Sequence, residues 1–314
     1  MWITDNIKNR KNKKNITFEV LTLEWLESKK KEVKESSFAN YSYTIKKYLM
    51  CEYQNDLLEI LEKKDFNEYI EELNQDLKPK TVRDIVVILK SILSYANDKY
   101  NCNIKIKQIK SSKLEQEPLV ILNKEEKDKL EKYCSKENSL KNIGIILCLN
   151  TGLRIGEICS LKWKNINLDK KEFYVRSTLQ RIYDDNLKNT KVIIDKPKTK
   201  ASIRNIPISN KIYNMIKEIQ KQHNENEYFL TGSSNEYIEP RIYRTYFKKV
   251  LRKSKIKTMY RFHILRHTFA SDCIGVGMDV KSLSEILGHT TVEMTLNKYV
   301  HSSYDQKKKF LEKL

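Results

Sequence analysis

Residues 263–267, His-Ile-Leu-Arg-His, are the stretch that decides the interpretation of this chain. His263 and Arg266 stand three positions apart, so both side chains lie on one face of a helix. An imidazole and a guanidinium placed in this way can contact one anionic ligand together. Because such a pair taken alone is more often a surface pair, its meaning depends on the motifs around it.

Two further motifs follow this stretch. Residues 287–289, Leu-Gly-His, place His289 directly after a glycine of the kind that ends helices. Tyr299 follows on a segment with apolar neighbours at Leu296 and Val300. A tyrosine in such a setting usually belongs to a core, so the sequence by itself leaves a packing role open for Tyr299.

The fourth motif contains an arginine and lies far upstream, in residues 151–157, Thr-Gly-Leu-Arg-Ile-Gly-Glu. Arg154 comes just after a turn and at the start of a predicted helix, where backbone N–H groups also point outward and favour a phosphate. The alternative is an arginine at a helix start that is paired with Glu157 three positions later.

In order and spacing, these four motifs resemble the signature of the tyrosine recombinase, or phage integrase, family. The resemblance covers the C-terminal two-thirds of the chain, and the N-terminal part looks like the core-binding domain of that family. It implies a mainly α fold with a small antiparallel β-sheet in the catalytic domain. It also implies a site-specific recombinase that cleaves and rejoins DNA through a 3′-phosphotyrosine, integrating and excising a mobile element.

The resemblance assigns a role to each residue of the motifs. Arg154 and Arg266 would hold the scissile phosphate, since two guanidiniums can stabilise charge on its non-bridging oxygens. Tyr299 would attack phosphorus, and because a phenol has a pKa of about 10 it needs a nearby base or a positive field. His263 is the best candidate for that base, and His289 would hydrogen-bond the phosphate. Either histidine could instead serve mainly as a donor.

The departing 5′ oxygen needs a proton, which in this family comes from a lysine on a β-hairpin turn. Residues 197–200, Pro-Lys-Thr-Lys, fit such a turn, and we assign the role to Lys198, with Lys200 as the alternative. Either lysine could also be an ordinary contact to the DNA backbone. Glu157 would orient Arg154 or a histidine without reacting.

Tyr260 and Tyr304 are the other candidates for the nucleophile, but neither follows the Leu-Gly-His motif at the family spacing. No nucleotide or metal cofactor is expected, because the sequence has neither a phosphate-binding Gly-x-x-x-x-Gly-Lys-Ser/Thr loop nor carboxylates spaced for two metal ions.

The six cysteines are scattered and are expected to be reduced. No run approaches the roughly 20 apolar residues of a membrane span, so we expect a cytoplasmic, nucleoid-associated protein.

Four segments are expected along the chain. Residues 1–15 form a basic arm, 16–110 a helical core-binding (SAM-like) domain, 111–118 a polar linker, and 119–314 the catalytic domain. Apolar residues recur at helical spacing throughout the second segment. The basic arm could equally be only a solvated terminus.

The catalytic segment is expected to mix helices and strands. Helices are predicted at about 124–135 and 139–149 and again from Asn210 onward, with one helix ending at Gly288. Between them, β-branched and aromatic residues predict one short antiparallel sheet. Its strands are Lys171–Ile182, Lys191–Asp195 and Ile203–Ile208.

The formal net charge of +19 favours a polyanionic partner, although it could also reflect only solubility or a lysine-biased coding sequence. We expect double-stranded DNA with recombination core sites, a homo-tetramer on that DNA, and an excisionase or a host DNA-bending protein as further partners. The candidate DNA contacts are exposed basic residues on predicted helices. They are Lys46, Lys47, Lys78, Lys80, Arg83, Arg241, Arg244 and Lys248.

Three alternatives share the same motifs. The chain could be a simpler, Xer-like resolvase or inversion recombinase that needs only core sites. It could be a regulator that binds DNA without cutting it, or a topoisomerase of the type IB chemistry.

The amphipathic tail from Ser302 to Leu314 would pack either on its own domain or on a neighbouring subunit.

Overall fold

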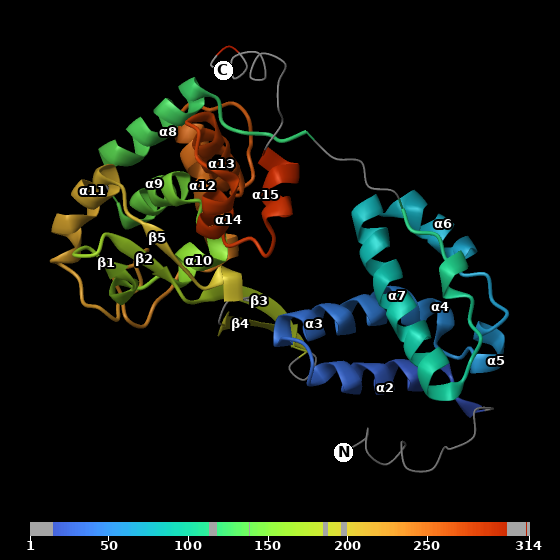
Figure 1. The fold of residues 1–314 in the computed structure, drawn as a ribbon. Coiled ribbons are helices and arrows are strands. Elements are labelled where there is room, and N and C mark those ends of the chain that lie inside the picture. Colours follow the sequence, from blue (N-terminus) through green and yellow to red (C-terminus); the bar gives the residue numbers. More distant parts are fainter. Residues whose placement is uncertain are drawn as a thin grey trace. The chain divides into compact units, whose positions relative to one another are not determined.

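The computed structural model describes residues 15–112, 118–137, 139–184, 188–195 and 200–299, together with Glu312. The predictions for the basic arm, for Lys198, for Tyr304 and for most of the tail fall outside these residues. The chain divides into two compact units (Figure 1). The first contains residues up to Glu117 and the segment Ile182–Lys191, and the second contains Pro118–Arg181 and everything from Val192.

Up to residue 112 the described part of the first unit is built from helices, as the apolar spacing predicted. Its elements are α2 (Phe18–Lys30), α3 (Glu35–Thr44), the π-helix η2 (Ile45–Leu49), α4 (Met50–Tyr53), α5 (Leu58–Leu61), α6 (Asn67–Asp76), α7 (Pro79–Tyr100) and the 3-10 helix η3 (Ile106–Gln108). The side chain of Thr17 caps α2 by accepting a hydrogen bond from the N–H of Val20. Pro79 opens α7, where its missing N–H costs nothing, and Asn101 ends it in the left-handed conformation.

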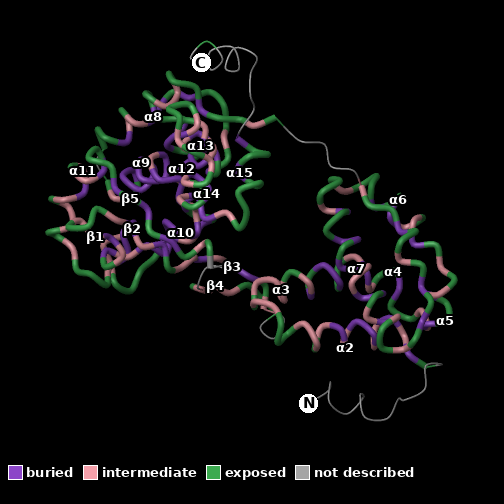
Figure 2. Tube along the Cα trace, viewed as in Figure 1, coloured by how far each residue is buried: buried purple, intermediate pink, exposed green. Residues whose placement is uncertain are grey.

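Each unit has its own buried core, as the purple segments of Figure 2 indicate. In the first unit, α7 contributes a continuous apolar stripe that includes Val82, Ile85, Leu89 and Leu93. Trp25 of α2 packs in the same core and donates from its indole nitrogen to Ser91. None of the described helices is both long and apolar enough to cross a membrane.

The second unit is mixed. Its helical elements are α8 (Lys124–Glu137), α9 (Leu140–Thr151), α10 (Ile155–Ser160), η4 (Trp163–Asn165), η5 (Lys200–Ser202), α11 (Asn210–Gln220), α12 (Pro240–Lys253), α13 (Ile264–Gly275), α14 (Val280–Leu287) and α15 (Val292–Tyr299). Helix α9 is buried around almost its whole circumference and packs on α8 and α13. The prediction that a helix ends at Gly288 is confirmed.

The strands form two sheets. Strands β1 (Ile166–Asn167), β2 (Glu172–Val175) and β5 (Arg204–Pro207) make an antiparallel sheet in the order β1-β2-β5, with Phe173 opposite both Ile166 and Ile206. Strands β3 (Thr178–Asp184) and β4 (Asn189–Asp195) form a separate pair.

The prediction of a single sheet with one strand over Lys171–Ile182 is therefore wrong, because that segment breaks between β2 and β3. At the break, Arg176 donates to the main-chain oxygen of Arg204, and the hydroxyl of Ser177 donates to that of Ser160. At this point hydrogen bonds from side chains thus replace the main-chain hydrogen bonds between strands. The β-propensity of the residues alone does not reveal such a break.

Candidate active site

Two helix ends with left-handed glycines frame the candidate site. Helix α9 ends at Gly152 with φ +66°, and α14 ends at Gly288 with φ +65°. After Gly288 the N–H of His289 returns to the carbonyl of Ser284 at 3.0 Å. This arrangement turns the chain sharply and leaves the last carbonyls of both helices available to other donors.

Arg266, on α13, joins these two helix ends. Its side chain is almost fully buried, and its two terminal nitrogens donate to the carbonyls of Gly152 at 2.8 Å and Leu287 at 2.7 Å. The carboxyl end of a helix carries partial negative charge, so a guanidinium is stabilised there. Burial lowers the pKa of Arg266 to about 9, which still leaves it protonated at neutral pH.

Arg154 reaches the same place from the start of α10. It donates to Glu157 at 2.9 Å and to the carbonyl of Gly288 at 3.0 Å, while about a third of its side chain stays exposed. The pair with Glu157, which was the alternative interpretation from the sequence, is therefore present, and the phosphate role of Arg154 stays a prediction. The arginine also presents charge to the surface.

Glu157 is buried between two arginines. Its carboxylate accepts two hydrogen bonds of 2.9 Å from Arg204, a bidentate pair, in addition to the bond from Arg154. Burial by itself would raise the pKa of Glu157, but the two guanidiniums outweigh it and hold that pKa at about 2. The carboxylate is thus ionised and fixes the position of Arg154.

Three arginines converge on the end of α14. They take three consecutive carbonyls, with the Nε of Arg204 on Ile286, Arg266 on Leu287, and Arg154 on Gly288. We call these three main-chain oxygens the α14 carbonyl row. Because the row consists of main-chain oxygens at the end of α14 and in its glycine turn, the arginines take these partners without help from any side chain of α14.

Tyr299 closes the site from α15. Its side chain is buried, and its phenol oxygen lies 2.9 Å from Nδ1 of His267. The ring of His289 stacks parallel to that of Tyr299, and its Nδ1 lies 2.8 Å from the hydroxyl of Thr295. The ring of His263 meets His267 edge-on, with centroids 4.4 Å apart.

The surroundings keep these rings neutral. Burial, and then nearby cations, lower the pKa of both His267 and His289 to about 4. Burial, then the neighbouring His267 and then nearby cations lower the pKa of His263, although that residue keeps an exposed surface. Burial raises the pKa of the Tyr299 phenol, while Arg266 and Arg154 act in the opposite direction. At neutral pH the site therefore holds a protonated phenol, uncharged imidazoles and cationic arginines.

The structure brings together most of the residues that the sequence singled out. Arg154, Glu157, His263, Arg266, His289 and Tyr299 all gather at the ends of α9, α13 and α14 and at α15. Lys198 and the side chain of Lys200 lie outside what the structure describes. Tyr260 is held elsewhere, with its hydroxyl on the carboxylate of Glu126 at 3.0 Å.

The candidate DNA contacts lie on exposed surfaces of both units. Lys46 and Lys47 belong to η2, where Lys47 donates to the hydroxyl of Tyr43. Lys78, Lys80 and Arg83 lie at the start of α7, and Arg241, Arg244 and Lys248 are exposed along α12.

Sequence reasoning missed three residues of the site. Arg204 lies on the buried face of β5, as does Ile206 two positions later, which belongs to the core. A charged residue on the apolar face of a predicted strand was the signal that could have revealed it. His267 stood within the quoted motif but received no role. Thr295, which contacts His289, gave no signal because it is one ordinary polar residue of a helix.

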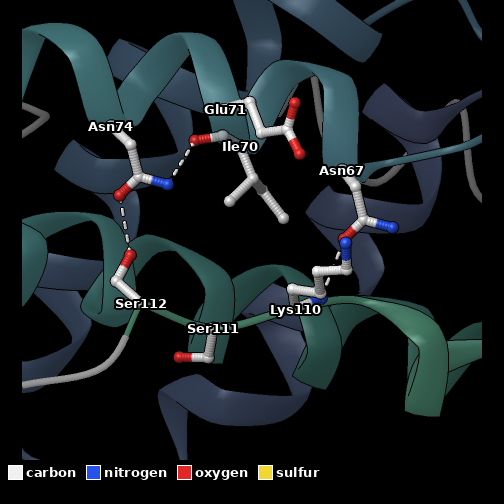
Figure 3. A pocket seen from close by; sticks show the side chains of 7 residues that line it. All are labelled: Asn67, Ile70, Glu71, Asn74, Lys110, Ser111 and Ser112. Carbon is white, nitrogen blue, oxygen red and sulfur yellow. Dashed lines mark hydrogen bonds between the residues drawn. The ribbon is translucent and has the colours of Figure 1, made fainter.

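A cavity of about 170 Å³ lies in the first unit, between α6 and residues 110–112 (Figure 3). No residue of the candidate site lines this cavity. Its polar groups bond to one another. Ser112 donates to Asn74, Asn74 donates to the carbonyl of Ile70, and the N–H of Lys110 donates to Asn67. These bonds attach the start of the predicted linker to α6.

Comparison with known proteins identifies the family of this chain. The family model described as "Phage integrase family" matches residues 120–306, and the model "Phage integrase, N-terminal SAM-like domain" matches residues 17–51. The first of these covers the whole candidate site.

Individual relatives extend over nearly the whole chain. A "Tyrosine recombinase XerC-like" protein of Caldanaerobacter subterraneus subsp. tengcongensis is 30% identical, over 97% of this chain and 85% of that protein. The "ICEBs1 integrase" of Bacillus subtilis is 25% identical, over 96% of this chain and 83% of its own length. Among solved structures, the Tn1549 transposon integrase in complex with transposon right end DNA matches with a TM-score of 0.77 at 20% identity, covering 95% of this chain and 99% of that one.

Proposed function

This chain belongs to the phage integrase family and is a tyrosine site-specific recombinase, and on that premise we propose that Tyr299 is the residue that becomes joined to DNA. The observation that carries the proposal is the position of the Tyr299 phenol, which lies beside an imidazole and within the field of Arg154 and Arg266. A nucleophile for a phosphodiester needs this combination of a proton acceptor and cations.

The proposed reaction begins when the phosphate of one strand enters between the two arginines. Arg154 and Arg266 stabilise charge on the non-bridging oxygens while the phenol oxygen of Tyr299 attacks phosphorus. The bond from phosphorus to the 5′ oxygen breaks, and a 3′-phosphotyrosine forms. A 5′ hydroxyl of another strand reverses these events, so the energy of the phosphodiester bond is kept in the intermediate.

Lys198 is the proposed donor of a proton to the departing 5′ oxygen. It stands between β4 and η5, six positions before Arg204, whose guanidinium contacts Glu157 of the site. A chain of six residues spans at most about 20 Å, and this short separation in sequence from Arg204 supports the proposal. His263 is the proposed base for the proton of Tyr299, and His289 is proposed to hydrogen-bond a phosphate oxygen, although either histidine could serve mainly as a donor.

We propose double-stranded DNA with core sites as the substrate and a tetramer as the acting form. Recombination of two duplexes cuts four strands, and each chain brings one Tyr299, so four copies complete one exchange. The exposed basic residues of η2, α7 and α12 support this proposal, because phosphate contacts supply most of the affinity of such proteins.

The match to the ICEBs1 integrase supports integration and excision of a phage or conjugative element. The accessory partners, an excisionase or a host DNA-bending protein, the nucleoid as the place of action and the domain plan are proposed from the sequence and its resemblance to the family alone. The proposed plan is a basic arm at 1–15, a core-binding domain at 16–110, a linker at 111–118 and a catalytic domain at 119–314.

The test is a covalent adduct. The protein and its Tyr299→Phe variant are incubated with a suicide duplex that carries an element-end core sequence, nicked near the cleavage point so that the cut fragment diffuses away. We expect a denaturation-resistant adduct with the native protein alone. If both proteins bind the duplex and neither forms the adduct, the chain acts as a non-cutting regulator. An adduct with the variant would assign the nucleophile to another tyrosine.

A further inference from the structure

The imidazole that contacts the Tyr299 phenol is His267, the residue after Arg266 in the His-Ile-Leu-Arg-His stretch. Its Nδ1 lies 2.9 Å from the phenol oxygen, a normal length for a hydrogen bond between these groups. His263, the candidate base from sequence, makes its recorded ring contact with His267. His263 is the N-cap residue of α13 and His267 lies four positions later in its first turn, so the two rings meet, and His267 is the one whose contact with the nucleophile is observed.

We propose that His267 is a catalytic residue of this recombinase that accepts the proton of Tyr299 as the phenol attacks phosphorus. This inference rests on the proposed function, in which Tyr299 is the nucleophile. It transfers the role of base from His263 to His267 and leaves His263 to donate to the phosphate.

The surroundings of His267 suit an acceptor. Burial lowers its pKa to about 4, and the positive charges of Lys298 and Arg266 act in the same direction. A neutral imidazole carries one proton on one nitrogen and a lone pair on the other. In the proposed arrangement Nδ1 accepts from the phenol, so the proton of the neutral ring is on Nε2.

The position of His267 is also well fixed. It lies in the first turn of α13, where its N–H donates to the carbonyl of His263 at 3.1 Å. The next residues toward the N-terminus include Arg266, which is tied to the ends of α9 and α14. The same helix, α13, therefore positions His267 and Arg266, one of the two arginines proposed to hold the phosphate.

The proton balance of the step is complete. As the oxygen–phosphorus bond forms, the phenol proton moves to Nδ1 of His267, which becomes an imidazolium. The 5′ oxygen leaves with a proton from the proposed acid, Lys198. On rejoining, the 5′ hydroxyl returns a proton to that acid, and His267 gives its proton back to the leaving phenolate. Because the ring is a weak base, the transfer keeps pace with bond formation rather than preceding it.

The decisive experiment separates activation of the nucleophile from protonation of the leaving group. Two suicide duplexes are compared that differ in one atom, with oxygen or sulfur at the bridging 5′ position of the cleaved bond. A thiolate leaves without needing a proton. The variants are His267→Asn, which keeps an oxygen acceptor near the place of Nδ1 but takes up no proton, and Lys198→Ala, the matched change on the acid side.

We expect His267→Asn to form the adduct about 100-fold more slowly than the native protein on both duplexes, in the range usual for loss of a general base. Lys198→Ala should be slow on the oxygen duplex and recover on the sulfur duplex. DNA affinity and thermal unfolding of His267→Asn, measured in parallel, should stay close to native values.

Several results would overturn the inference. A His267→Asn rate within about threefold of native leaves no role for proton transfer to this ring. Recovery of this variant on the sulfur duplex would assign His267 to the leaving group.

If His267→Asn fails to fold, His267→Gly and His263→Gly are compared with imidazole added to the buffer. Restored cleavage in the first supports the inference, and restoration in the second alone contradicts it. Failure of the native protein to form any adduct would instead refute the proposed function itself.

Discussion

At the scale of single residues, the site depends on charges that are buried and fully paired. Glu157 and Arg204 are both almost inaccessible, and their bidentate contact replaces the water that each group has lost. Removing one partner of such a pair leaves the other charge buried without compensation. These two residues should therefore matter for folding as well as for catalysis.

Replacing Arg204 tests this dependence. We expect Arg204→Met to lower the free energy of unfolding by about 3–5 kcal/mol, because the carboxylate of Glu157 stays buried without its main partner. The matched control is Arg181→Met, which breaks the exposed pair with Glu239 and should cost below about 1 kcal/mol. Urea unfolding followed by circular dichroism measures both, and equal losses would contradict the prediction.

Glu157 also predicts a dependence of stability on pH. Its pKa is about 2 in the folded protein and 4.5 in the reference state, so the folded state binds the proton more weakly. The stabilisation is complete above about pH 4.5 and is lost as the pH falls toward about 2, and it amounts to about 3 kcal/mol.

The matched comparison is with Glu157→Gln. At pH 7 the native protein should be the more stable by about that amount, and the difference in urea-unfolding free energy should shrink as the pH is lowered from about 4.5. A difference that does not change with pH would show that the charge of Glu157 contributes nothing.

At the scale of elements, the ends of helices carry the site. Gly288 has φ +65°, and a Cβ there would lie 3.0 Å from Cδ of Arg204 and 3.1 Å from the carbonyl of Ala201. Glycine is therefore needed at position 288 for two reasons: the backbone is left-handed there, and η5 and β5 approach too closely to leave room for a Cβ. Gly275 is different, since a Cβ added there meets nothing within 4 Å.

These two glycines form a matched pair for mutation. We expect Gly288→Ala to lower stability by about 1–2 kcal/mol through backbone strain, and to slow adduct formation because Arg154 loses the correct position of its carbonyl partner. Gly275→Ala should be neutral or stabilising by up to about 1 kcal/mol, since it ends α13 without strain. Thermal unfolding and the adduct assay decide this, and a tolerant Gly288 would contradict it.

Much of this level was predictable from the sequence. Burial of one helix face sets the spacing of apolar residues, so helices such as α7 and α14 could be recognised from the sequence. The glycine that ends α14 is a local signal as well, whereas Asn101 at the end of α7 gave none. The break at Arg176 and Ser177 depends on partners far along the chain, Arg204 and Ser160, which a local pattern does not contain.

The candidate site divides in the same way. His263, Arg266 and Tyr299 stand out because their residue types and spacing suit phosphoryl chemistry. Arg204 and Thr295 act through contacts to Glu157 and His289 that exist only after folding. The contact between His267 and Tyr299 likewise joins two helices, and no spacing within one helix predicts which histidine of α13 meets the phenol.

At the scale of the whole molecule, the excess of basic residues predicts how the proposed DNA binding responds to salt. Each phosphate contact contributes about 0.9 to the slope of the logarithm of affinity against that of salt concentration. We expect Arg83→Gln, at the start of α7, to reduce that slope by about 1. Lys221→Gln, whose ammonium is already paired with Glu218, should leave it unchanged. Fluorescence anisotropy over a salt series measures both, and equal slopes for Arg83→Gln and native protein would exclude a phosphate contact there.

The α14 carbonyl row has a consequence for how such a chain can vary. Because Arg154, Arg204 and Arg266 bind main-chain oxygens, the side chains at residues 286 and 287 can be exchanged, within the limits of packing, without altering the partners of the arginines. The length of α14 has no such latitude. One inserted residue would rotate the row by about 100° and advance it by about 1.5 Å, which takes each oxygen away from its guanidinium. Substitutions should therefore accumulate in this helix far more readily than insertions or deletions.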